Sequence, residues 1–280
     1  MNGSIRQAKF AGKFYPETKE ELVHFLNFIL KVETNKINTT LTKFPILGIV
    51  APHAGYIYSG YHAVHAYQIL KLANQSFDTV VVINPNHSGM GTGNYNLSCS
   101  YQWNTPLGLL VQDTEFMEAL SIECFDPAHE QEHSGEVQLP FLQNFLPNSF
   151  RIVMITMNHQ THANAKILAQ KLANAAKITK RKTLIVASSD FSHYEDVETG
   201  FNKDQYLIDR ILQLNAEECY NQVKKHHITA CGYGPVMTLI EYAKLVSDKP
   251  KMELLRRGHS GEVSFSNKVV DYASFLCYEK

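Results

Sequence analysis

Few cysteines, little net charge and no long apolar run characterise this 280-residue chain, and each shortage excludes a class of protein. The five cysteines are scattered and never form a CxxC pair, which argues against a disulfide framework or a structural zinc site. Lys plus Arg total 26 and Asp plus Glu 27, so the net charge of −1 excludes strong bulk attraction to nucleic acid or acidic membranes. No run approaches the ~18 apolar residues of a membrane helix. The opening MNGSIRQAKFAGKFYPE lacks the apolar stretch of a secretory signal, so we expect a cytoplasmic protein.

Hydrophobic residues make up 44% of the chain, which is enough for a large core. Short apolar runs alternate with segments of helical spacing, a pattern typical of βαβ units and a largely parallel sheet. We predict strands at 46–51, 79–83, 151–157, 183–187, 251–256 and 269–278, and helices at 59–72, 134–145, 162–176, 202–214, 216–224 and 231–246. No linker or low-complexity segment divides the chain, so we predict one α/β domain over residues 1–280.

Polar side chains that can bind metal or move protons follow four of the predicted strands. They are His53, His87, His159 and the pair Asp190 and His193. In open α/β sheets a ligand binds beyond the carboxyl ends of the strands, so these loops are expected to converge. A single histidine after a strand is more often a loop residue or a cap. The near-identical strand–proline contexts of His53 and His87 favour a ligand role for these two.

Cys231 opens the segment Cys-Gly-Tyr-Gly-Pro where a helix is predicted to begin. A helix N-terminus lowers the pKa of a thiol and favours the thiolate, which is both a nucleophile and a soft metal ligand. The alternative is a buried, inert cysteine. The flanking glycines, which allow close backbone approach, favour a functional role. The other cysteines lack such a setting.

Further histidines have weaker contexts. His133 lies in the turn-rich stretch EHSGE and is a candidate for the same site, whereas capping explains Ser134 and Glu136. His62 and His65 are three residues apart in a predicted helix, which favours a helix surface over a metal site. The pentapeptide HSGEV recurs at 259–263, where we predict a polar turn before the last strand.

Six motifs, in order along the chain, resemble the Memo family, also called AmmeMemoRadiSam system protein B. They are AGKFYP, APHAGYIYSG, NPNHSG, EHSGEVQLPFL, SSDFSHY and ACGYGP, and VVDYASF extends the resemblance towards the end of the chain. The family is similar to class III extradiol dioxygenases, which are non-haem iron enzymes. The resemblance therefore implies a single three-layer α/β/α domain with a mainly parallel, mixed central sheet.

Carried over position by position, the resemblance implies a metal site formed by His53, His87 and Cys231. It places Phe14 and Tyr56 at the substrate. It also implies that the catalytic pocket residues are His193, Asp190 and His133.

Cys231 departs from the dioxygenases, whose third metal ligand is a carboxylate. A thiolate is softer and can itself be oxidised. We therefore expect iron or copper, with zinc as a further candidate, and no efficient cleavage of catechol-type rings.

Two classes of function follow from the resemblance. The first is a metal-dependent oxidoreductase in which His193 is the acid/base and Asp190 orients it. The second is a non-enzymatic binding module whose vestigial cleft holds a peptide or a partner protein, because animal Memo proteins resemble adaptors that recognise phosphotyrosine peptides. Prokaryotic members are linked by name to a radical-SAM protein, which is an expected partner beside an unidentified small molecule or peptide.

Overall fold

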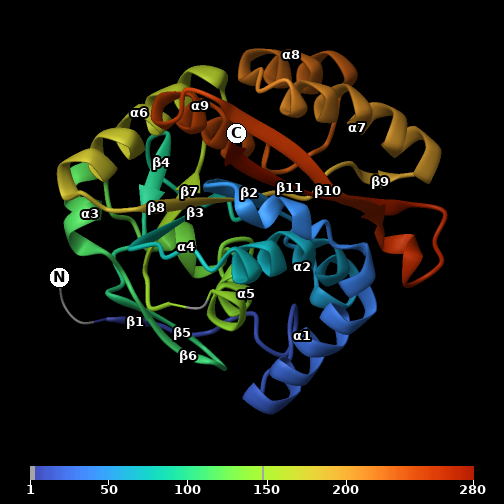
Figure 1. Ribbon diagram of the computed structural model, residues 1–280, viewed down its shortest axis with the longest axis horizontal. Helices are drawn as coiled ribbons and strands as arrows, with labels where there is room; N and C mark the ends of the chain where they lie inside the picture. Colours follow the sequence, from blue (N-terminus) through green and yellow to red (C-terminus); the bar gives the residue numbers. More distant parts are fainter. Residues whose placement is uncertain (1–3, 147) are drawn as a thin grey trace.

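A mixed central sheet forms the middle layer of the protein in a computed structural model that describes residues 4–146 and 148–280 (Figure 1). Its strands are β2 (Ile46–Ala51), β3 (Thr79–Pro85), β4 (Tyr95–Leu97), β7 (Arg151–Met157), β8 (Thr183–Ser188), β10 (Pro250–His259) and β11 (Val269–Glu279). They lie in the order β10-β11-β2-β8-β3-β7-β4. The inner strands β2, β8, β3 and β7 are parallel, and the others join antiparallel. The carboxyl ends of the parallel strands therefore meet at one edge.

Helices cover both faces of this sheet, which gives three layers (Figure 1). One face carries α1 (Lys19–Glu33), α2 (Tyr56–Ala73) and α5 (Gln138–Phe145). The other carries α3 (Thr114–Leu120), α6 (His162–Thr179), α7 (Val197–Leu212), α8 (Ala216–His226) and α9 (Tyr233–Val246). Smaller elements are β1 (Ile5–Arg6), β5 (Gln102–Thr105), β6 (Gly108–Val111), α4 (Pro127–Glu130) and β9 (His193–Glu195), which pairs with β11. None of the helices in the described ranges is long and apolar enough to cross a membrane.

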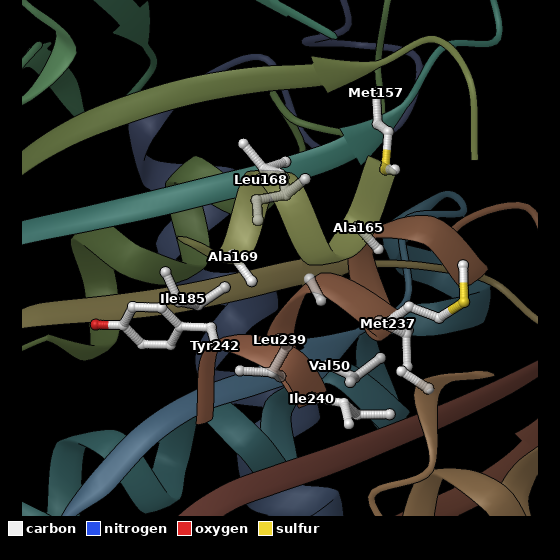
Figure 2. Packing of buried hydrophobic residues seen from close by; sticks show 14 of the residues in the cluster. Val50, Met157, Ala165, Leu168, Ala169, Ile185, Met237, Leu239, Ile240 and Tyr242 are labelled. Carbon is white, nitrogen blue, oxygen red and sulfur yellow. The ribbon is translucent and has the colours of Figure 1, made fainter. Parts of the chain in front are cut away.

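Alternate residues of the parallel strands supply the two halves of the core. Val80 and Val82 of β3 face the α1, α2 and α5 layer, whereas Val81 and Ile83 face the opposite layer. Successive side chains of a strand point to opposite faces, so a strand buried on both faces must be apolar throughout. Figure 2 shows the second half, where Ala165, Leu168 and Ala169 of α6 pack with side chains of α9.

The predicted strands at 46–51 and 151–157 are confirmed with the bounds of β2 and β7. The helices predicted at 59–72, 162–176, 202–214, 216–224 and 231–246 correspond to α2, α6, α7, α8 and α9, with ends that shift by a few residues. The prediction that Ser134 and Glu136 cap a helix is wrong. α5 begins at Gln138 and is preceded by Val137 without a side-chain cap. The second HSGEV segment forms a short turn of 3-10 helix, Ser260–Glu262, between β10 and β11, as predicted.

Glu136 anchors the amino-terminal segment beside the cleft. Its buried carboxylate forms an ion pair with Arg6, accepts a hydrogen bond of 2.6 Å from the Tyr15 hydroxyl, and accepts further bonds from the backbone N–H groups of Phe10 and Lys9 at 2.9 and 3.2 Å. A buried charge is stable only when it is paired and hydrogen-bonded, and these donors meet that condition. The AGKFYP segment is thereby held against the HSGEV loop.

Candidate metal centre

Three histidines from three different loops meet at the carboxyl edge of the sheet. His53 follows β2, His87 follows β3, and His133 precedes α5. One ring nitrogen of each lies within 4.8 Å of those of the others, so the group can hold a metal ion. The ring centroids are 4.9 to 5.5 Å apart. The predicted convergence of His53 and His87 is observed, and His133 joins them.

The hydrogen bonds of His53 fix which of its nitrogens is free. The Ser188 hydroxyl donates its proton to the Ser134 carbonyl at 2.7 Å, so it can only accept from His53 Nδ1 at 2.8 Å. Nδ1 therefore carries the ring proton, and the Nε2 lone pair points away from Ser188. Burial, reinforced by the charges of His87 and His133, holds the pKa of His53 well below its usual range, which keeps the ring neutral.

Glu132 performs the same function for His87. Its carboxylate accepts from His87 Nδ1 at 3.0 Å and from the backbone N–H of His87 at 2.5 Å. It also accepts from the Ser134 hydroxyl at 2.6 Å and lies 3.6 Å from Nδ1 of His133. Because a carboxylate only accepts, Nδ1 of His87 is protonated and its Nε2 is free. A carboxylate behind a histidine in this way is a common support of metal ligands.

The pKa values of Glu132, His87 and His133 reflect two effects, burial and the charge of a close neighbour. Burial opposes ionisation of Glu132, but the hydrogen bond and charge of His87 outweigh it and lower the pKa of Glu132 to about 2. Burial also lowers the pKa of His87, yet Glu132 more than compensates and the pKa ends above its ordinary value. Burial lowers the pKa of His133 to about 4, which keeps that ring neutral.

Cys231 lies at the second ring nitrogen of His53, Nε2, and bonds to it. Its Sγ is 3.0 Å from His53 Nε2 and accepts a hydrogen bond of 3.3 Å from the backbone N–H of Asp190. α9 begins two residues later, at Tyr233. The expected lowering of the pKa of this thiol by the helix N-terminus is wrong. Burial raises the pKa of Cys231 well above its usual range, and the charge of Asp190 adds to this effect.

Asp190 and His193 lie beside this cluster, but each has its own partner. Asp190 accepts from the backbone N–H of His53 at 2.8 Å, and its other oxygen is 3.9 Å from His53 Nε2. His193 is held instead by Thr229, whose carbonyl accepts from Nδ1 at 3.0 Å. Asp190 thus positions the His53 loop, and Thr229 orients His193. Burial raises the pKa of Asp190, opposed by His193 and by backbone N–H donors.

The two predicted substrate residues have different surroundings. Phe14 stacks on His133 with ring centroids 4.4 Å apart, so it forms a wall of the cleft. Tyr56 is buried, and its hydroxyl donates to the Val137 carbonyl at 2.5 Å. Both border a hollow of about 400 Å³ whose other lining includes Phe25 and Tyr58. The hydroxyl of Tyr56 is therefore committed to the fold, whereas Phe14 faces the site.

Several residues that shape the site carry no sequence signal. Glu132, Ser188 and Thr229 act through contacts between distant loops, which periodicity does not reveal. The prediction that His62 and His65 lie on a helix surface is also wrong. Both are buried on α2, because this helix is covered by the sheet on one side and by α1 and the β10–β11 turn on the other.

Gly232 permits the close approach that brings Cys231 to His53. A Cβ on residue 232 would lie 2.1 Å from the Ser188 carbonyl oxygen, which is backbone and cannot move away. We expect Gly232→Ala to lower the free energy of unfolding by about 1–3 kcal/mol and to displace Cys231. Gly55→Ala is the matched control, because its Cβ would meet nothing closer than 3.8 Å. Denaturant unfolding of both variants tests this. Equal stability would show that the contact at residue 232 does not restrain α9.

The three-layer fold with a histidine cluster at its carboxyl edge defines an α/β protein with a candidate metal centre. A family model described as Memo-like protein matches residues 6–276. A MEMO1 family protein of Methanococcus vannielii is 38% identical and covers 97% of this chain and 99% of its own length. Relatives of the same name from Methanococcoides burtonii and Nitrosopumilus maritimus are 37% and 35% identical, covering 97% and 96% of this chain and 99% and 98% of their own. The chain belongs to the Memo family.

Among solved structures, an uncharacterized protein, JW3007, from Escherichia coli K12 shares 11% sequence identity with this chain. It matches 82% of this chain and 99% of its own, with a TM-score of 0.49. A likeness at this level has no bearing on function.

Proposed function

We propose that this protein binds one transition-metal ion, iron or copper, through His53, His87 and Cys231, and that the occupied cleft serves metal-dependent redox chemistry. The observation that carries the proposal is the hydrogen bond of 3.0 Å between His53 Nε2 and Cys231 Sγ, which brings a nitrogen and a sulfur donor together in the cleft. The histidine nitrogens that face away from the cleft are already committed to Ser188 and Glu132. Two imidazoles whose Nδ1 atoms are held by Ser188 and Glu132, together with one sulfur ligand, form a donor set that suits these metals.

The metal would supply one-electron redox chemistry and polarise a bound ligand. The remaining residues of the cleft hold and move protons. His193 has Nδ1 bound to Thr229, so its Nε2 is the nitrogen available to take up a proton in the acid/base role. Asp190 acts on His53 through the backbone rather than on His193, so it is a positioning residue in this scheme. His133, clamped between Phe14 and His87, borders the space where a substrate would lie.

A binding module is the second candidate function. The supporting observation is the hollow of about 400 Å³ beside Phe14, which is lined by aromatic rings and bordered by Lys13. Aromatic walls with one cationic group suit an apolar or aromatic peptide side chain. This function needs no metal, so metal stoichiometry separates the two candidates.

Metal content provides the test. We expect the chain, purified without added metal or loaded anaerobically with Fe(II) or Cu(I), to hold one ion as measured by inductively coupled plasma mass spectrometry. His53→Gln removes a ligand and is expected to reduce retention at least about tenfold. His24→Gln, on the exposed side of α1, is the matched control and should retain the ion. A wild-type chain that holds no ion under any of these conditions would favour the binding module.

A further inference from the structure

Two cysteines outside the metal centre, Cys99 and Cys124, lie on segments of the chain that pair with each other. Cys99 is half-buried and Cys124 is exposed, so small molecules in solution can reach the pair. The other cysteines outside the cleft, Cys219 and Cys277, are buried.

The backbone holds the two segments in register. Leu97 and Cys124 are bridge partners, with Leu97 donating to the Glu123 carbonyl at 2.9 Å and Phe125 donating to the Leu97 carbonyl at 2.9 Å. One residue further on, the Asp126 carboxylate accepts from the backbone N–H of Cys99 at 2.7 Å. These bonds hold the backbones of the two cysteine segments side by side, which brings Cys99 close to Cys124.

We propose that Cys99 and Cys124 form a reversible disulfide. In the reaction one thiolate attacks a sulfur of a low-molecular-weight disulfide, forms a mixed disulfide and releases one thiol. The second cysteine then attacks the mixed disulfide and releases the other thiol. The protein loses two protons and two electrons, and the small disulfide is reduced to two thiols.

A disulfide between Cys99 and Cys124 would restrain a segment that leads to the histidine cluster. Cys99 follows β4, which borders the loop after His87, and Cys124 lies a few residues before α4 and the Glu132-His133 segment. A covalent bond here closes a loop of roughly 25 residues and removes conformational freedom from the unfolded chain. It would tie the segment that carries Glu132 to the edge of the sheet. The inference does not depend on the proposed metal, because neither cysteine contacts the histidine cluster through any bond described above.

The local charges make the reaction slow at neutral pH. Burial, the neighbouring thiol and the carboxylates of Asp126 and Glu123 raise the pKa of Cys124 to about 11, and burial with Asp126 also raises the pKa of Cys99. The attacking thiolate is scarce below these values. The rate should therefore rise about tenfold per pH unit across the range below them.

Oxidised glutathione is the probe that tests the proposal. We expect wild-type protein to lose about 2 Da on oxidation, to yield a Cys99–Cys124 linked peptide in a non-reduced digest, and to unfold at a temperature several degrees higher. Dithiothreitol should reverse all three changes. Cys99→Ser and Cys124→Ser each remove one partner, so the remaining thiol should stop at the glutathione adduct. Serine is close in size to cysteine, so both variants are expected to fold.

Two results would overturn the proposal. In the first, the wild-type chain accumulates glutathione adducts at Cys99 or Cys124 without the linked peptide. In the second, neither cysteine reacts at pH 7.5 or 9 while denatured protein reacts fully. Metal content of the reduced protein is measured in parallel, so a failure of the disulfide is distinguished from a failure of the metal site.

Discussion

Replacing Glu136 by glutamine is expected to lower the free energy of unfolding by about 3–5 kcal/mol, the usual effect of removing one partner of a buried ion pair. Every group that contacts this carboxylate is a donor: the Arg6 guanidinium, the Tyr15 hydroxyl and two backbone N–H groups. The amide of glutamine would turn an NH₂ group towards these donors, and the Arg6 charge would remain buried without compensation. Denaturant unfolding followed by circular dichroism measures the loss.

Glu115→Gln is the matched control for this prediction. Glu115 also pairs with an arginine, Arg181, at 2.9 Å, but its side chain is 63% exposed. Exposed pairs contribute about 0–1 kcal/mol, so this variant should remain within that range of the wild type. Similar small losses in both variants would show that the Arg6 pair is replaced by water on substitution.

Replacing Cys231 by serine is expected to reduce metal affinity more than about 100-fold, beyond the 10–100-fold effect of losing a residue that only supports a ligand. The serine hydroxyl remains protonated near neutral pH and is a poor ligand for iron or copper. The change in volume is small, so the fold should be retained. Competition with a chromophoric chelator gives the affinity, and circular dichroism checks the fold.

His133→Gln is the companion variant and separates two donor sets. If His53, His87 and Cys231 hold the metal, the glutamine variant keeps most of the affinity and loses only what His133 contributes to the cleft. If the three histidines hold it, the order reverses: His133→Gln loses the metal and Cys231→Ser keeps it. The nitrogens of the three histidines lie within 4.8 Å of one another, whereas for the set with Cys231 the contact seen is that of its Sγ with His53, at 3.0 Å.

The parallel strands could be predicted from sequence because each is buried on both faces. A short, continuous apolar run such as RIVMITM is what a strand buried on both faces needs. β7 has the predicted bounds. The helix α1 escaped prediction although Thr18 caps it and Leu22, Leu26 and Ile29 bury one side. The cap and the spacing of these three residues are local signals of an amphipathic helix, so α1 was missed although the sequence contains its pattern.

The site was predictable at the level of loops but not of contacts. His53 and His87 follow strands, Cys231 lies two residues before α9, and these placements are encoded locally. The partners of these residues are not. Glu132 binds His87 across 45 positions, and Glu136 binds Arg6 across 130, so no local pattern reports either contact. The pKa of the Cys231 thiol was mispredicted for the same reason, because the burial that raises it depends on how several loops pack over this residue.

The place of β11 in the sheet governs the order in which this protein can fold. Its residues 275–278 pair with β2, at positions 46–50, so two central neighbours lie more than two hundred residues apart in sequence. Contacts of such separation slow folding, because a long loop must close before any bonds form. During synthesis the edge of β2 that pairs with β11 therefore remains unpaired until β11 has left the ribosome. Such edges pair readily with other chains. A chain truncated before residue 269 should consequently aggregate rather than accumulate as a smaller folded protein.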